Sequence, residues 1–130
     1  PGHTTGHIAF HFFKEKKIFT GDTLFSLGCG KIFEGTYEQM FNSLKKIKTL
    51  HKDTEVYCGH EYTLQNSNFC AKYDSNNFQL KNKITKIKEK LESGLPTVPT
   101  ILSEEIQCNL FLKANDVQTF SKLRDLKDNF

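Results

Sequence analysis

Residues 21–36 read GDTLFSLGCGKIFEGT, a stretch that is rich in glycine and has no regular hydrophobic period. Such a long irregular segment inside a compact domain usually lines a site. The residues before it predict two strands, and the residues after it predict a helix and a third strand. This order of strand, strand, loop, helix and strand is typical of a layered α/β arrangement.

Upstream of this stretch, residues 6–13 place Ile8, Phe10 and Phe12 at alternate positions, which predicts a strand with one face more buried. The charged turn KEKK leads from it to KIFT, so the two segments are expected to form a hairpin.

Downstream, Thr36 and Gln39 have the spacing of a capping box that opens a helix. Residues 55–59, EVYCG, then predict a short buried strand that ends at His60. In the helix between them, five residues are expected to face the hydrophobic core: Met40, Phe41, Leu44, Ile47 and Leu50.

From Glu61 onward the sequence shows only helical periodicity and loops. Helices are predicted over residues 62–73, 76–93, 103–108 and 116–127. Gly94 ends the longest of them. Its expected inward positions are Phe78, Leu80, Ile84, Ile87 and Leu91.

The composition is that of an ordinary globular chain of 130 residues, with 37% hydrophobic residues and a net charge of +3. The mild charge, and lysines that alternate with apolar positions in KNKITKIKEKLE, argue against nucleic-acid or membrane binding. The four cysteines are widely spaced and form no C-x-x-C pair, which favours reduced thiols inside a cell. A cytoplasmic monomer is expected, with an organelle left open as the compartment.

Three residues could carry metal chemistry because His3, Asp22 and His60 each lie at a predicted strand end beside glycine. Imidazole and carboxylate groups suit divalent zinc or iron. Taken singly, each also has an ordinary structural explanation as a hydrogen-bonded histidine, a turn aspartate or a helix cap. The remaining histidines are interpreted as structural: His7, His11 and His51.

Taken together, PGHTTGH, FTGDTLF, GCGKIFEGT and YCGHEYT resemble the metallo-β-lactamase superfamily and, more narrowly, the glyoxalase II (hydroxyacylglutathione hydrolase) family. LPTVP and LRDLKDNF extend the resemblance to residue 130. It implies an α/β fold: the second half of a metallo-β-lactamase-like αββα sandwich, followed by an all-helical C-terminal domain. Residues 1–61 would belong to the metal-binding domain, and residues 62–130 to the helical glutathione-substrate-binding domain.

The resemblance also implies an activity, the hydrolysis of S-D-lactoylglutathione and related thioesters to glutathione and D-lactate in methylglyoxal detoxification. His3 and His60 would be metal ligands, and Asp22 would bridge two divalent ions, zinc first with iron or manganese as alternatives. Two cations lower the pKa of a shared water and polarise the thioester carbonyl.

The expected partner is therefore a small glutathione thioester. By resemblance, its contacts would come from Lys31, Phe33, Tyr62, Arg124 and Lys127. Without the resemblance, Arg124 and Lys127 would be interpreted as a solvated helix face, and Lys31 as a loop charge.

The family motif THxHxDH, which supplies the other metal ligands, does not occur in the sequence. The chain is therefore expected to be a fragment that is inactive alone and exposes a sheet face. Phe33 stands where the family commonly has tyrosine, and NLFLK at residues 109–113 replaces an NPFLR-like stretch. Two alternatives stay open: a persulfide dioxygenase-like enzyme with one iron, and a non-catalytic glutathione-binding fragment.

Overall fold

A mixed four-stranded sheet organises the first part of the chain in the computed structural model, which describes residues 1–130. Its strand order is β1 (Phe10–Phe12), β2 (Lys17–Gly21), β5 (Glu55–Cys58) and β6 (Thr100–Ile101). β1 and β2 form the predicted antiparallel hairpin, and β2 runs parallel to β5. Helix α1 (Tyr37–Lys48) lies between β2 and β5 in the chain, which confirms the expected layered α/β order.

The edge strand β6 comes from the second half of the chain and was not predicted. It consists of two residues and pairs antiparallel with β5, Thr100 opposite Val56. A second, two-stranded sheet lies within the glycine-rich stretch, where β3 (Leu24–Phe25) pairs with β4 (Gly28–Cys29). Pieces this short carry no periodicity of their own, because they form through long-range or turn contacts.

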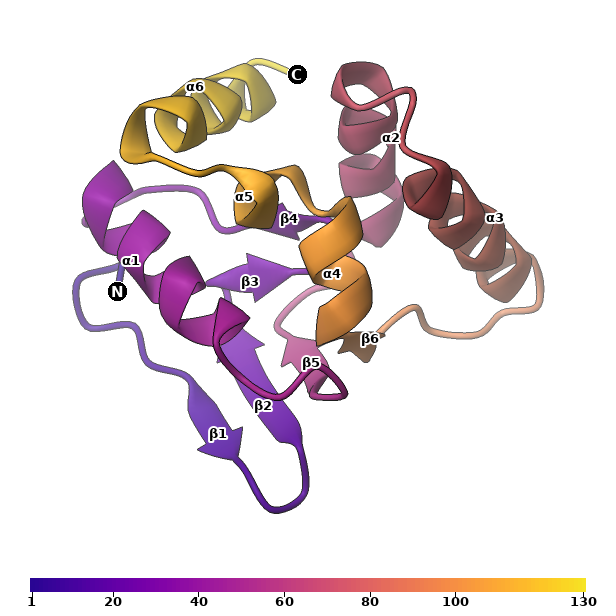
Figure 1. Ribbon diagram of the computed structural model, residues 1–130, viewed down its shortest axis with the longest axis horizontal. Coiled ribbons are helices and arrows are strands. Elements are labelled where there is room, and N and C mark those ends of the chain that lie inside the picture. Colours follow the sequence, from indigo (N-terminus) through magenta and orange to yellow (C-terminus); the bar gives the residue numbers. More distant parts are fainter.

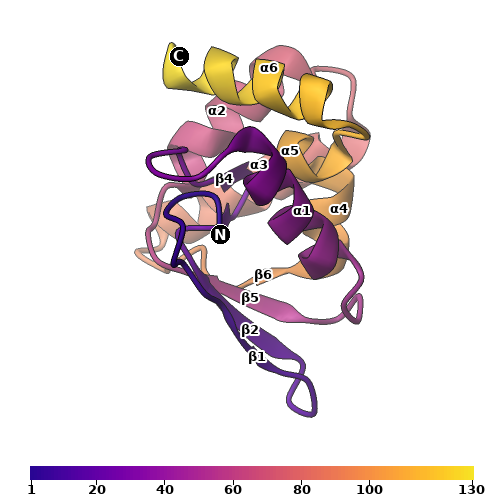
Figure 2. The same ribbon diagram turned by 90° about the vertical axis from the view of Figure 1, so that its left-hand side faces the viewer.

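One face of the large sheet is bare. Figure 2 shows the helices gathered on one side of the strands, and no element covers the other side. Phe10, Phe12 and Phe19 lie there with exposed fractions of 59%, 50% and 43%. The expectation that one face of the first strand is more buried is wrong, because all three residues of β1 are exposed. The structure therefore has the exposed sheet face that was expected.

The opposite face of the sheet is packed against helix α1. Ile18 and Val56 are buried there, with exposed fractions of 3% and 0%. The capping box is present as predicted, since the Thr36 hydroxyl accepts from the Gln39 N–H and the Gln39 side chain accepts from the Thr36 N–H. Of the five predicted inward residues, Leu50 is half-buried and the other four are buried: Met40, Phe41, Leu44 and Ile47.

Five helices follow residue 61: α2 (Thr63–Tyr73), α3 (Phe78–Glu92), α4 (Leu102–Cys108), α5 (Leu110–Lys113) and α6 (Val117–Asp128). All but the four-residue α5 were predicted. In α3, Leu80 and Ile87 are buried as expected, but Phe78 and Leu91 are 69% and 39% exposed. Those two expectations are wrong: both residues lie near the ends of α3, which Figure 1 shows at the periphery of the molecule.

The two halves of the chain share one hydrophobic core. Its largest cluster joins Ile18 and Val56 of the sheet to Phe69, Phe111 and Phe120 of the later helices. A division into domains at residue 61 therefore stays a prediction, since this core crosses it.

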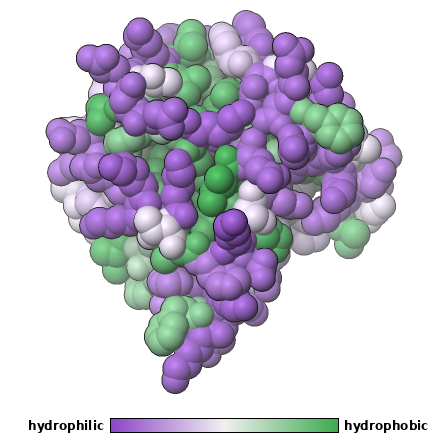
Figure 3. Space-filling view, in the orientation of Figure 1, coloured by the Kyte–Doolittle hydropathy of each residue, from purple (hydrophilic) through white to green (hydrophobic).

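No helix is long and apolar enough to span a bilayer. In Figure 3 one face of the molecule is mostly hydrophilic, with apolar side chains near the β1–β2 hairpin.

We expect the paired change Phe10→Thr and Phe12→Thr to reduce self-association of the 130-residue chain, because it removes exposed apolar surface while retaining β-forming residues. Light scattering at increasing concentration measures this effect. The free energy of unfolding should change by less than about 1 kcal/mol, because both side chains are exposed.

The matched control is Phe69→Ala, which removes a fully buried ring and should cost about 3–5 kcal/mol in urea unfolding. Unchanged scattering in the paired variant would show that the bare face does not drive association.

Candidate functional site

The structure brings His3, Asp22 and His60 together from three separate segments. His3 lies before β1, Asp22 directly follows β2, and His60 follows β5. The His3 Nε2 atom is 3.4 Å from Asp22 Oδ2, and the His60 Nε2 atom is 3.3 Å from Asp22 Oδ1. The carboxylate therefore lies between two imidazoles, and each of its oxygens faces a different ring.

Glycines allow this close approach. A Cβ atom on Gly30 would lie 1.8 Å from the Asp22 carbonyl oxygen, and one on Gly59 would lie 2.7 Å from Asp22 Oδ1. Gly21 has φ +54°, a left-handed conformation that glycine adopts without strain, and its carbonyl accepts from the Gly59 N–H at 2.7 Å. The sequence GD at the end of β2 and the sequence CGH at the end of β5 therefore fit against each other.

The ring of His3 is oriented by the glycine-rich stretch. Its Nδ1 lies 2.7 Å from the carbonyl oxygen of Lys31, so Nδ1 carries the proton and donates it. Because Nδ1 is engaged in this bond, Nε2 is the ring nitrogen that faces Asp22 and is placed to meet a metal ion. Phe33 packs edge-on against the same ring, with 5.0 Å between ring centroids.

His7 holds the backbone of Asp22 and not its carboxylate. Its Nε2 accepts from the Asp22 N–H at 3.0 Å, and its Nδ1 lies 3.1 Å from Thr23 Oγ1. Burial lowers the pKa of His7, which keeps the ring neutral and able to accept. This agrees with the structural role expected of it. His11 and His51 are exposed and lie outside this cluster.

Aromatic rings flank the other histidine. Tyr62 stacks on His60 with centroids 4.7 Å apart and planes 9° apart, and Phe25 meets both rings at an angle. The His60 side chain remains 47% exposed. Tyr62 and Phe33, two of the predicted substrate contacts, therefore lie against the two predicted metal ligands.

The predicted cationic contacts differ in exposure. Lys31 is exposed, whereas Arg124 is only 5% exposed. Arg124 donates from Nη1 to the Cys29 carbonyl oxygen at 2.6 Å and pairs with Asp128 at 3.0 Å. The interpretation of Arg124 as part of a solvated face is wrong, because the guanidinium lies under the strand that leads to Lys31. Lys127 is half-buried, and burial followed by repulsion from Arg124 lowers its pKa.

The thiols near the site are not ionised at neutral pH. Cys29 is buried, and burial raises its pKa to about 11 despite the neighbouring Arg124. Burial likewise raises the pKa of Cys70 to about 12 and that of Cys108 to about 11. All four cysteines are free, as expected from their spacing.

The donor set of His3, Asp22 and His60 has the right chemistry for divalent zinc or iron. No group of three or more His, Cys, Asp or Glu side chains in the chain could hold a metal ion by itself. The pairwise distances are short, but each histidine meets only the carboxylate. These three side chains by themselves therefore do not form a metal site.

Sequence reasoning missed the residues that hold the glycine-rich stretch from behind. Asn66, Glu105 and Asn109 are 4%, 0% and 0% exposed and bond to residues 25–28. The available signal was a polar residue at an inward position among apolar neighbours, as in Cys108–Asn109–Leu110.

Comparison with protein families divides the chain into two matched parts. Residues 1–60 match the family model described as the metallo-beta-lactamase superfamily, and residues 61–130 match that described as the hydroxyacylglutathione hydrolase C-terminus.

Curated relatives match along nearly the whole chain. A hydroxyacylglutathione hydrolase of Pelagibacter ubique is 64% identical over 130 residues, which are all of this chain and 54% of that protein. The hydroxyacylglutathione hydrolase of Prochlorococcus marinus (strain MIT 9301) is 48% identical over 128 residues, 98% of this chain and 52% of that protein. The chain spans about half the length of the curated relatives it matches.

Solved structures share the fold. ETHE1 from Myxococcus xanthus superposes with a TM-score of 0.63 and 24% identity, covering 96% of this chain and 42% of that chain. A metallo-beta-lactamase from Staphylococcus aureus gives a TM-score of 0.59 and 20% identity, covering 98% of this chain and 37% of that one. At these identities the likeness concerns the fold alone. It confirms the expected α/β class, part of a metallo-β-lactamase fold followed by helices.

We expect His7→Ala to speed amide hydrogen exchange at Asp22, because the Asp22 N–H loses its acceptor. The free energy of unfolding should fall by about 1–3 kcal/mol. Exchange followed by NMR measures the first effect, and urea unfolding the second. His11→Ala is the control, since His11 is exposed on β1. Equal exchange rates at Asp22 in both variants would contradict the assigned role of His7.

Proposed function

This chain belongs to the hydroxyacylglutathione hydrolase family, and we propose that it supplies the second part of a thioester hydrolase. The substrate is S-D-lactoylglutathione or a related 2-hydroxyacylglutathione, and the products are glutathione and D-lactate. The curated relatives are about twice as long as this chain, so the proposed activity is that of the whole protein.

The observation that carries the proposal is the position of the Asp22 carboxylate between two imidazoles. His3 meets one oxygen at 3.4 Å and His60 meets the other at 3.3 Å. A carboxylate flanked by two imidazoles offers the oxygen and nitrogen donors that divalent metal ions bind, so these three side chains would hold the ions.

Membership of the metallo-β-lactamase superfamily implies divalent metal ions. We assign His3 and His60 as ligands and Asp22 as the bridging carboxylate, with zinc as the first choice of metal. The Lys31 carbonyl fits this assignment, because its bond to Nδ1 orients the His3 ring with Nε2 toward Asp22. Bound divalent cations would activate water and polarise the thioester carbonyl.

The other predicted site residues of the chain would interact with the substrate, directly or indirectly. Glutathione carries two carboxylates at neutral pH, which suits the cationic side chains of Lys31 and Lys127. Phe33 and Tyr62, both exposed beside the metal ligands, would provide apolar walls near the reacting carbonyl. Arg124 would act indirectly, because its hydrogen bond to the Cys29 carbonyl supports the segment that carries Lys31.

The reaction adds water to the thioester carbonyl, and the C–S bond then breaks. Sulfur leaves as a thiolate, which needs little help because thiols are far more acidic than alcohols. The residues of this chain would therefore orient the thioester carbonyl and limit side reactions. His3, Asp22 and His60 would stay fixed in position during the reaction. We also propose a division into two domains at residue 61, with the metal ligands before it and substrate contacts on both sides of it.

We expect the full-length protein to hydrolyse S-D-lactoylglutathione and Asp22→Ala to abolish turnover. Loss of the bridging carboxylate should also lower the bound metal, measured by elemental analysis of dialysed protein. Wild-type activity in Asp22→Ala would contradict the assigned site. The isolated 130-residue chain should be inactive.

Lys127→Ala in the full-length protein should mainly raise KM, by about tenfold, because it removes one charge-assisted contact with substrate. Steady-state kinetics separate this from a change in kcat. Lys122→Ala is the matched control, since Lys122 lies on the exposed side of the same helix. Equal KM values in the two variants would contradict the binding role of Lys127.

A further inference from the structure

The hairpin formed by β3 and β4 is inserted into the helical half of the chain. Leu27 lies at its tip with φ +61° and is 0% exposed. Its side chain belongs to a small hydrophobic cluster whose other members come from the helices: Cys70, Leu80, Ile87 and Cys108. A leucine held at positive φ is strained, so the surrounding helices must compensate for that conformation.

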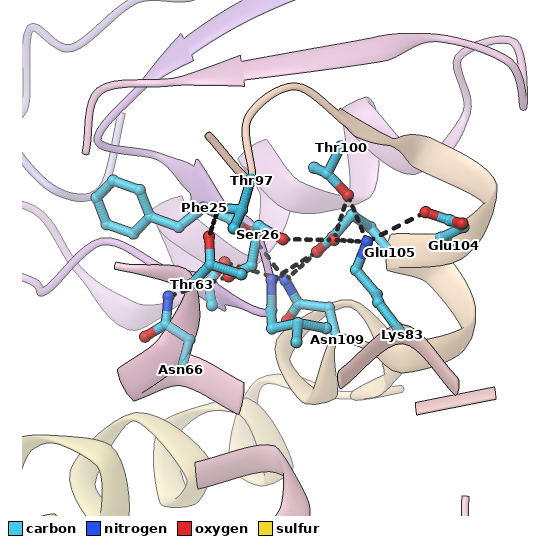
Figure 4. Close-up of polar contacts among 12 residues, drawn as sticks. Phe25, Ser26, Thr63, Asn66, Lys83, Thr97, Thr100, Glu104, Glu105 and Asn109 are labelled. Carbon is cyan, nitrogen blue, oxygen red and sulfur yellow. Dashed lines mark hydrogen bonds and ion pairs between the residues drawn. The ribbon is translucent and has the colours of Figure 1, made fainter. Parts of the chain in front are cut away.

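Side chains of the helices bond the backbone of the hairpin tip, as Figure 4 shows in part. Asn109 Nδ2 donates to the carbonyl oxygens of Phe25 and Gly28 at 3.3 Å and 3.0 Å. Asn66 Nδ2 donates to the Ser26 carbonyl at 3.1 Å. These bonds replace the water that a turn of this kind normally meets at a protein surface.

Glu105 accepts a backbone N–H group at the tip, that of Leu27. Its Oε1 accepts from the Leu27 N–H at 2.8 Å, and its Oε2 accepts from the Ser26 hydroxyl at 3.2 Å. The carboxylate is 0% exposed and also accepts from Thr100 Oγ1 at 2.7 Å. Lys83 Nζ lies 3.5 Å from Oε2, which provides the charge that a buried carboxylate requires.

The base of the same hairpin carries the candidate site. Asp22 lies two residues before β3, and Lys31 lies two residues after β4. The Gly30 N–H donates to the Thr23 carbonyl at 3.1 Å and closes the base. The Lys31 carbonyl then accepts from His3 Nδ1. A displacement of the hairpin would therefore move Asp22 directly and His3 through its bond to Lys31.

We propose that Glu105 is a positioning residue: its bond to the Leu27 N–H seats the β3–β4 hairpin in the helices and thereby aligns Asp22 and His3. Glu105 touches neither substrate nor metal in this role. The catalytic consequence rests on the proposed hydrolase function, whereas the effect on His3 does not.

A pair of double variants in the full-length protein separates the hairpin bond from the buried ion pair. Glu105→Leu with Lys83→Met removes both interactions and leaves no unpaired buried charge. Glu105→Gln with Lys83→Met removes the ion pair and, as the first double variant also does, the Lys83 bonds to Thr100 and Glu104. The amide oxygen of glutamine can still accept from the Leu27 N–H, and its NH₂ group can donate to the Ser26 and Thr100 hydroxyls.

The first readout needs no activity. In metal-free protein, ¹⁵N NMR of the imidazoles reports whether His3 carries its proton on Nδ1, and amide exchange reports the Leu27 N–H. We expect the leucine double variant to mix the two His3 tautomers and to speed Leu27 exchange by about tenfold or more. The glutamine double variant should match wild type in both measurements.

The second readout is kinetic. In metal-loaded protein the leucine double variant should lose about tenfold or more in kcat, with KM changed by less than about twofold, because the reacting groups are misaligned while substrate contacts remain. If that variant does not fold, Glu105→Asp takes its place, since it retains the charge but is one methylene too short to reach Leu27. It should shift His3 and kcat in the same direction.

An unchanged His3 tautomer and unchanged Leu27 exchange in the folded leucine or aspartate variant would overturn the proposal. Equal losses in the leucine and glutamine double variants would also overturn it, because the ion pair and not the hairpin bond would then be responsible. A wild-type protein without hydrolase activity would refute the proposed function alone, because the NMR readout would still decide the role of Glu105.

Discussion

The insertion of the β3–β4 hairpin into the helices is the constraint on which the rest of the structure depends. A turn buried this deeply has no water to satisfy its backbone, so each polar group needs a partner from the surrounding helices. Asn66, Glu105 and Asn109 provide those partners. Because the hairpin begins just after Asp22 and ends just before Lys31, the same contacts also position these two residues of the candidate site. The helical half thus supports the segment that carries Asp22 and Lys31.

The sequence was most informative where residue type and local geometry determine the structure together. The capping box at Thr36, the strand ending at Cys58 and the convergence of Asp22 with two histidines all depend on short segments with distinctive chemistry. Positions at predicted strand ends beside glycine grouped His3 with Asp22 and His60, and the resemblance to a known family then gave the group its expected metal roles. The metal and substrate roles themselves stay predictions.

Other features depend on contacts between distant segments, which a local pattern does not contain. Alternation in β1 identified which residues share a face, but it could not tell whether anything covers that face. Helical spacing placed Arg124 and Lys127 on one side of α6, but it could not show that the Cys29 carbonyl lies beneath Arg124. Likewise β6, with two residues, exists only because β5 offers it an edge.

The raised pKa of the buried thiols bears on the kind of substrate proposed. A thioester transfers its acyl group readily to any thiolate within reach, and the product would be an acylated enzyme instead of a free acid. Burial raises the pKa of Cys29 to about 11, so this thiol stays protonated at pH 7, and it is also shielded from solvent. With the proposed thioester substrate, burial of this sulfur within the glycine-rich stretch would keep Cys29 from becoming an acyl acceptor.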